Sequence, residues 1–110
     1  MSELARHVVV LTTVPAEGDT AEILPHTLVA RRLAACVNVL PAMTSVYLWG
    51  GKIERGEERQ LIIKTTAEQL PKIEEAFREL HPYDIPELIA LEIVGGSQRY
   101  LEWVTASVSR

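Results

Sequence analysis

The chain has 110 residues, fifteen acidic and eleven basic, and 47% of its residues are hydrophobic. This length and apolar content predict a single domain, residues 1–110, with a core of its own. The formal charge of -4 argues against a nucleic-acid-binding protein, because such domains concentrate Lys and Arg on one face.

The single cysteine, Cys36, excludes an intramolecular disulfide and a structural zinc site built from several thiolates. The first seven residues lack the basic start and apolar core of a secretory signal. No apolar run approaches the roughly 18 residues that a membrane-spanning helix needs. We therefore expect a cytoplasmic protein with no membrane partner.

The first half of the chain predicts alternating strand and helix. Residues 8–14 are β-branched and apolar, which favours a buried strand. Residues 19–22 resemble a capping box, and apolar spacing predicts a helix that ends near Leu33. Either this helix is kinked at Pro25 or its regular part begins at Pro25. Residues 35–49 predict two extended segments around Pro41, either separate strands or one long bent strand.

The middle of the chain predicts a long hairpin. Gly50-Gly51 is a turn signal, and the charged residues 52–58 are too polar for a core. Residues 60–66 are apolar and β-branched, as in a buried strand. The hairpin therefore combines an apolar base with a solvated, charged arm.

The last third predicts helix, strand and helix. A second capping-box pattern at residues 66–69 precedes a helix that Pro82 ends. Residues 88–94 predict a strand, and Ser97 is placed to cap a short terminal helix.

This order of elements predicts an α+β fold of the ferredoxin-like type, βαββαβ, with a long bent hairpin and a short C-terminal helix. Right-handed crossovers place both long helices on one face of the sheet. The strands are nevertheless apolar on both faces, since Leu61 to Ile63 and Leu88 to Leu91 are continuous apolar runs. We expect a partner subunit to cover the second face.

Strand alternation places three polar side chains on that second face. If Ile89 and Leu91 face the helices, then Glu92 points away from them, as do Lys64 and Asn38. Each of these groups needs a hydrogen bond or a counter-charge once it is buried. An ion pair and polar anchor between subunits is favoured over an active site.

Residues 81–87 hold an imidazole, a phenol and two carboxylates on a segment stiffened by two prolines. One interpretation is a metal or small-anion site that uses His81, with Glu87 or Asp84 as second ligand. The other, which spacing alone favours, is a helix end followed by a turn. No catalytic motif is present, so we expect no enzyme and no catalytic residue. Cys36 fits a small buried apolar residue better than a copper ligand or nucleophile.

Five motifs in chain order resemble the CutA divalent-cation tolerance family, and they extend over nearly the whole chain. They are Leu33-Ala34-Ala35-Cys36-Val37-Asn38, Thr44 to Trp49 with Gly51-Lys52, Ile63-Lys64-Thr65-Thr66, His81-Pro82-Tyr83 with Pro86-Glu87, and Tyr100-Leu101 with Trp103. The resemblance implies a ferredoxin-like subunit in a tight homotrimer. It also implies a role in tolerance of copper and other divalent metals, with no organic cofactor.

The resemblance further implies metal ligation near the end of the first strand and just before the Pro-Tyr pair. The matching positions here are Thr12, Leu80 and His81, and of these only His81 offers an imidazole. The expected metal ligands are therefore His81 and, as a weaker second, Glu87, with Cu(II) or another divalent cation as the ion.

An alternative function is a trimeric small-molecule sensor or scaffold, built like the PII signalling trimers. Its clefts between subunits would hold an anionic or amphipathic ligand. The residues expected to bind that ligand are Lys64, Trp49, Tyr83 and Glu87.

Overall fold

The computed structural model describes residues 6–108 and confirms the predicted order of elements. The elements are β1 (His7–Pro15), α1 (Thr20–Ala30), β2 (Cys36–Trp49), β3 (Lys52–Thr66), the 3₁₀ turn η1 (Ala67–Gln69), α2 (Leu70–Leu80), β4 (Ile89–Glu92) and α3 (Gln98–Ser107). No helix among the described residues is long and apolar enough to cross a membrane.

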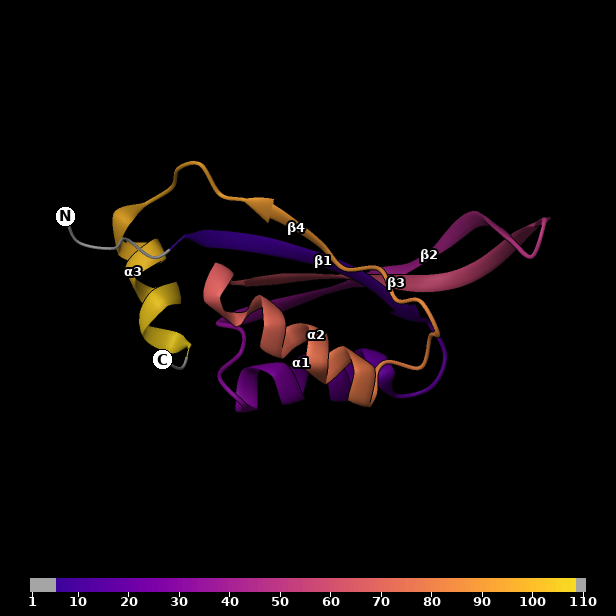
Figure 1. Cartoon of the computed structure of the whole chain (residues 1–110), viewed down its shortest axis with the longest axis horizontal. Coiled ribbons are helices and arrows are strands. Elements are labelled where there is room, and N and C mark those ends of the chain that lie inside the picture. Colours follow the sequence, from indigo (N-terminus) through magenta and orange to yellow (C-terminus); the bar gives the residue numbers. More distant parts are fainter. Residues whose placement is uncertain (1–5, 109–110) are drawn as a thin grey trace.

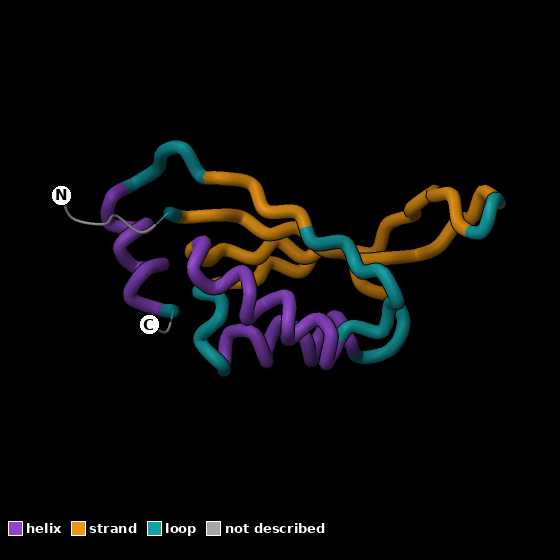
Figure 2. The backbone as a smooth tube through the Cα atoms, viewed as in Figure 1, coloured by secondary structure: helices purple, strands orange, loops and turns teal. Residues whose placement is uncertain are grey.

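The four strands form one sheet in the order β2-β3-β1-β4, and every neighbouring pair is antiparallel. Helices α1 and α2 lie on the same face of the sheet, and α3 lies at the end of the sheet away from the hairpin tip (Figure 1). The β2–β3 hairpin extends beyond the other strands, which gives the molecule a long axis of 51 Å (Figure 2). The α+β ferredoxin-like fold is confirmed.

The core lies between the sheet and the two helices. Alternate residues of β1 and β3 are buried there, because successive side chains in a strand point to opposite faces. They pack against the inner faces of α1 and α2, and the buried residues include Val8, Val10, Val14, Leu24, Leu28, Leu61, Ile63, Ile73 and Phe77.

The opposite face of the sheet, which we call the open face, carries no helix among the described residues. Leu91 lies opposite Val9 and Ile89 lies opposite Leu11 on this face, and Ile89 and Leu91 are 47% and 49% exposed. Two strands thus present an apolar surface that residues 6–108 do not cover.

This register corrects one prediction about β4. Glu92 lies opposite the buried Val8, so it faces the helix side, whereas Ile89 and Leu91 face the open side. The predicted alternation was therefore wrong by one residue. Residues 88–91 are apolar throughout, and a continuous apolar run carries no signal that separates one face from the other.

The helix ends also differ from the predicted capping boxes. Neither Asp19 nor Thr66 caps a helix through its side chain, whereas the Ser97 hydroxyl accepts a hydrogen bond from the Tyr100 amide, as predicted. Helix α1 runs unbroken through Pro25 and ends at Ala30, followed by Arg32 in the left-handed region with φ of 60°. That conformation, which is costly without glycine, turns the chain toward β2.

Strands β2 and β3 form the long, bent hairpin that the sequence predicted. Strand β2 continues through Pro41 with a shift in register between Val39 and Ala42. The Arg59 guanidinium donates to the Leu40 carbonyl at 2.8 Å and so supports the bend. Gly50 and Gly51 both have positive φ, which the tight turn of the hairpin requires.

Leu28 and Val29 provide a test of which face of α1 is in the core. Leu28 is fully buried, so Leu28→Ala should lower the free energy of unfolding by about 2–5 kcal/mol, through lost apolar contact and a residual cavity. Its neighbour Val29 is exposed, and Val29→Ala should change stability by less than about 0.5 kcal/mol. Urea denaturation measures both, and equal losses would contradict this packing.

Candidate functional site

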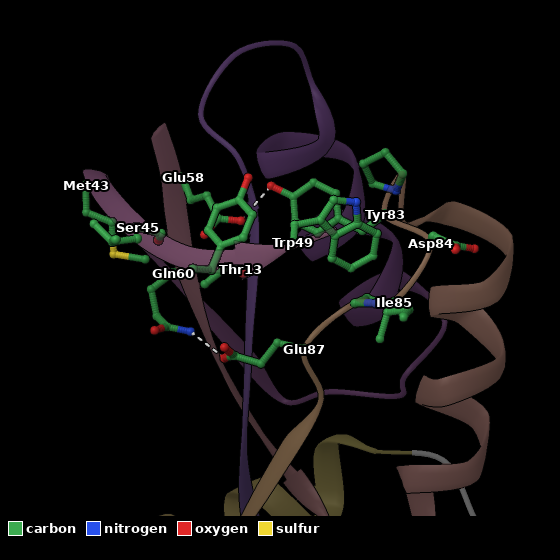
Figure 3. Close-up of a pocket in the computed structure, with 14 residues that line it drawn as sticks. Thr13, Met43, Ser45, Trp49, Glu58, Gln60, Tyr83, Asp84, Ile85 and Glu87 are labelled. Carbon is green, nitrogen blue, oxygen red and sulfur yellow. Dashed lines mark hydrogen bonds between the residues drawn. The ribbon is translucent and has the colours of Figure 1, made fainter. Parts of the chain in front are cut away.

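A cavity of about 790 Å³ lies between the β2–β3 hairpin and the connector of residues 82–87. Figure 3 shows the side chains that line it. They come from β1 (Thr13), β2 (Met43, Ser45, Val46, Tyr47, Trp49), β3 (Glu58, Gln60) and the connector (Pro82, Tyr83, Asp84, Ile85, Pro86, Glu87). A volume of this size suits a small-molecule ligand.

The polar floor of the cavity belongs to the open face of the sheet. Gln60 alternates with the buried Leu61 and lies opposite Thr13. The Gln60 side-chain amide donates to the Thr12 carbonyl at 2.7 Å and to the Glu87 carboxylate at 3.3 Å. Gln60 thereby fixes Glu87, at the end of the connector, to the centre of the sheet (Figure 3).

Tyr83 and Glu58 join the connector to the hairpin. The Tyr83 hydroxyl donates to the Glu58 carboxylate at 2.6 Å, and Figure 3 shows this bond across the cavity wall. Burial is the largest cause of a raised pKa for the Tyr83 phenol, and the neighbouring Glu58 raises that pKa further. The phenol is therefore a hydrogen-bond donor, not an anion, at neutral pH.

His81 is buried where α2 ends, with 8% of its surface exposed. Its Nε2 lies 2.9 Å from the Thr13 carbonyl, to which it donates, and its Nδ1 accepts from the Tyr83 amide at 3.2 Å. The ring also packs between Phe77 and Tyr83. Burial lowers the pKa of His81 and outweighs the opposing effect of the Thr13 carbonyl. A neutral imidazole with both nitrogens bonded thus positions the start of the connector.

Of the four residues expected to bind a small ligand, the structure brings Trp49, Tyr83 and Glu87 to one cavity. Lys64 does not line it. Lys64 lies on the open face near the C-terminal end of β3, opposite Cys36. Its ammonium donates to the Asn38 side chain. The sequence therefore placed Lys64 and Asn38 correctly on the open face, but not Lys64 in the cavity.

Sequence reasoning missed Glu58 and Gln60 as cavity residues. Both lie in the stretch that looked like a solvated arm and the start of a strand. The available signal was their spacing of two residues, which puts both side chains on the face that also carries Lys64.

The expected metal ligands do not form a recognisable cluster. Within residues 6–108, no group of three or more His, Cys, Asp or Glu side chains is placed to hold a metal ion. Glu87 lines the cavity, whereas His81 directs both ring nitrogens to backbone groups. Thr12 is fully buried, and Cys36 is half-buried.

These features define a class of protein: a small ferredoxin-like domain with an apolar open face and one acidic, aromatic cavity beside its hairpin. The chain belongs to the CutA1 divalent ion tolerance protein family, whose model matches residues 8–107.

The relatives agree with that assignment. A divalent-cation tolerance protein CutA of Thermus thermophilus is 46% identical over 87% of this chain and 92% of its own length. A CutA protein of Arabidopsis thaliana is 43% identical, and this chain spans 58% of its length. The crystal structure of CutA1 from Oryza sativa superposes with a TM-score of 0.92 at 41% identity and covers 98% of both chains.

The expected cytoplasmic location is not supported by these relatives. The Arabidopsis and rice proteins are described as chloroplastic. A structure from Archaeoglobus fulgidus, 31% identical, with a TM-score of 0.88 and covering 94% of this chain and 99% of its own, is described as that of a periplasmic protein. The cytoplasmic prediction, which rested on the single cysteine and on the lack of a secretory signal or membrane-spanning run, is therefore corrected by these relatives.

The buried His81 predicts acid sensitivity. Because its pKa is lowered in the folded chain, protonation favours the unfolded chain. Its contribution to stability is present above the ordinary imidazole pKa of 6.5 and is lost as the pH falls from there through the folded value. In urea denaturation, His81→Gln should therefore lower the free energy of unfolding at about pH 8. Between about pH 8 and about pH 5, the variant should then lose less stability than the wild type does.

The matched control is His26→Gln, since His26 is exposed on α1. This variant should keep the wild-type dependence of stability on pH. If His81→Gln also kept that dependence, His81 would not be the group responsible.

Proposed function

We propose that this chain acts as a homotrimer, without enzymatic activity, in tolerance of divalent cations. The apolar open face is the observation that carries the proposal. Ile89 and Leu91 are about half exposed on it, next to the partly buried Val9 and Leu11. An uncovered apolar surface of this kind favours association with another copy.

The hairpin supports the same proposal. Leu48 and Ile53 lie opposite each other near its tip and are exposed. The hairpin projects beyond the sheet, where a second copy can be reached (Figure 1). This exposed apolar pair on an otherwise charged arm gains free energy only when a neighbour covers it.

Light scattering after size-exclusion chromatography tests the assembly. The wild type should have about three times the 12.3 kDa mass of one chain. Leu91→Glu places a charge on the open face and should dissociate the assembly or weaken it by more than about tenfold, because an unpaired buried charge is costly.

The control for this variant is Val29→Glu, on the outer surface of α1, which should leave the mass unchanged. A wild-type monomer at micromolar concentration would contradict the proposed covering of the open face. So would a Leu91→Glu protein with the mass of the wild type.

For the cation itself, the proposed ligands are Glu87 and His81, with Cu(II) as one of the ions bound. Glu87 is partly buried and borders the cavity. His81 can ligate only after Nδ1 releases the Tyr83 amide, because Nε2 donates to the Thr13 carbonyl. A carboxylate and one imidazole make a weak, reversible site unless another copy adds a ligand.

Calorimetric titration with Cu(II) tests these ligands. Glu87→Gln and His81→Gln should each weaken binding by about tenfold or more, since each removes a direct ligand. His26→Gln removes an exposed imidazole elsewhere and should have no effect. An absence of heat with the wild type would reject direct binding, and an effect confined to His26→Gln would show adventitious surface binding.

A second candidate function is a sensor or scaffold for a small molecule, and the cavity is the observation that favours it. It has the volume of a ligand site, about 790 Å³, and its lining includes Trp49, Tyr83 and Glu87, three of the four residues expected to bind a small ligand.

A further inference from the structure

We propose that the cavity between the hairpin and the connector binds an organic cation, an alkylammonium or arylalkylammonium group, instead of an anion. The inference rests on the second candidate function and names its ligand class. It revises the anionic ligand expected from Lys64, which does not line the cavity.

The charge of the lining has one sign. Three carboxylates border the cavity, those of Glu58, Asp84 and Glu87, and no Lys, Arg or His is among its lining residues in the described chain. The ion pairs between described residues are Arg31 with Glu79 and Arg78 with Glu75, so neither Glu58 nor Glu87 is neutralised in this way. Such a cavity attracts cations and repels anions.

Neutral donors fix two of these carboxylates in place. The Tyr83 hydroxyl holds Glu58 at 2.6 Å, and the Gln60 amide holds Glu87 at 3.3 Å. Gln60 is itself fixed to the Thr12 carbonyl at 2.7 Å. A neutral donor fixes the position of a carboxylate without placing a positive charge beside it, which is the arrangement that a cationic ligand needs.

Aromatic rings complete the site. Trp49, Tyr47 and Tyr83 all line the cavity, and Trp49 is 53% exposed in the single chain. The faces of indole and phenol rings attract cations through their quadrupole, most strongly for Trp. Aromatic rings together with fixed carboxylates are the combination that recognises substituted ammonium groups.

A bare metal ion fits this cavity less well than an organic cation. Divalent ions need several ligands that converge within a short distance. No group of three or more His, Cys, Asp or Glu side chains between residues 6 and 108 does so. The volume also far exceeds one ion, whereas apolar and aromatic walls are suited to the hydrocarbon part of an amphipathic cation.

Three soluble probes that share a phenyl ring and differ in charge test the inference: benzyltrimethylammonium, benzyl alcohol and benzoate. The chain has two tryptophans, Trp49 and Trp103. In a Trp103→Phe background the fluorescence therefore reports on Trp49 alone. Benzyltrimethylammonium should change this fluorescence and bind at least about tenfold more tightly than the other probes. Its affinity should fall with added salt.

Calorimetry with the same cation separates the contributions of the side chains. Trp49→Ala should weaken binding about 5- to 30-fold through loss of the ring face. Glu87→Gln, which removes only the charge, should also weaken it. The matched control is Glu68→Gln, an exposed carboxylate on η1 outside the cavity, which should bind as the wild type does. Thermal melting checks that each variant is folded.

The outcomes distinguish this inference from the function on which it rests. Benzoate binding as tight as that of the cation, and weakened by Lys64→Gln, would overturn the cationic ligand and leave the small-molecule function standing. Equal affinity for all three probes would also overturn it. An absence of binding by any probe to folded protein would reject the small-molecule function as well.

Discussion

The structure depends on a four-stranded sheet that is apolar on both faces, with two long helices available to cover only one of them. On the helix side, Val10 and Ile63 are fully buried. On the open side, Ile89 and Leu91 remain about half exposed. Since burial of apolar area is the main favourable term in folding and association, the uncovered face is where the chain still has free energy to gain.

The same constraint locates the cavity. The hairpin extends beyond the other strands (Figure 1), and the cavity between it and the connector is lined in part by Thr13 and Gln60 of the open face. His81 and Gln60 hold the two ends of the connector through backbone carbonyls of β1, and Tyr83 ties its middle to the hairpin. The candidate site is thus positioned by hydrogen bonds to the sheet, even though most of its residues lie in irregular or projecting segments.

Family membership and site chemistry give different kinds of information here. The match over residues 8–107 establishes a divalent ion tolerance family, whereas the geometry shows a histidine engaged by its own backbone and a cavity with acidic and aromatic walls. A histidine with both nitrogens bonded contributes first to the fold, because breaking either bond leaves a buried polar group without a partner. The Glu58 and Glu87 carboxylates accept hydrogen bonds from Tyr83 and Gln60, but a carboxylate has further acceptor sites, and both residues line the cavity.

Local sequence patterns were enough to predict the order of strands and helices, the long hairpin, the cap at Ser97 and the apolar surplus. These follow from local periodicity and turn residues, which act over a few positions. Three features required the folded chain: Glu92 faces the helices, Lys64 lies outside the cavity that Trp49 lines, and Glu58 accepts a hydrogen bond from Tyr83. Those outcomes depend on strand register and on the path of a connector. Both are fixed by contacts between residues far apart in the chain, which no local pattern encodes.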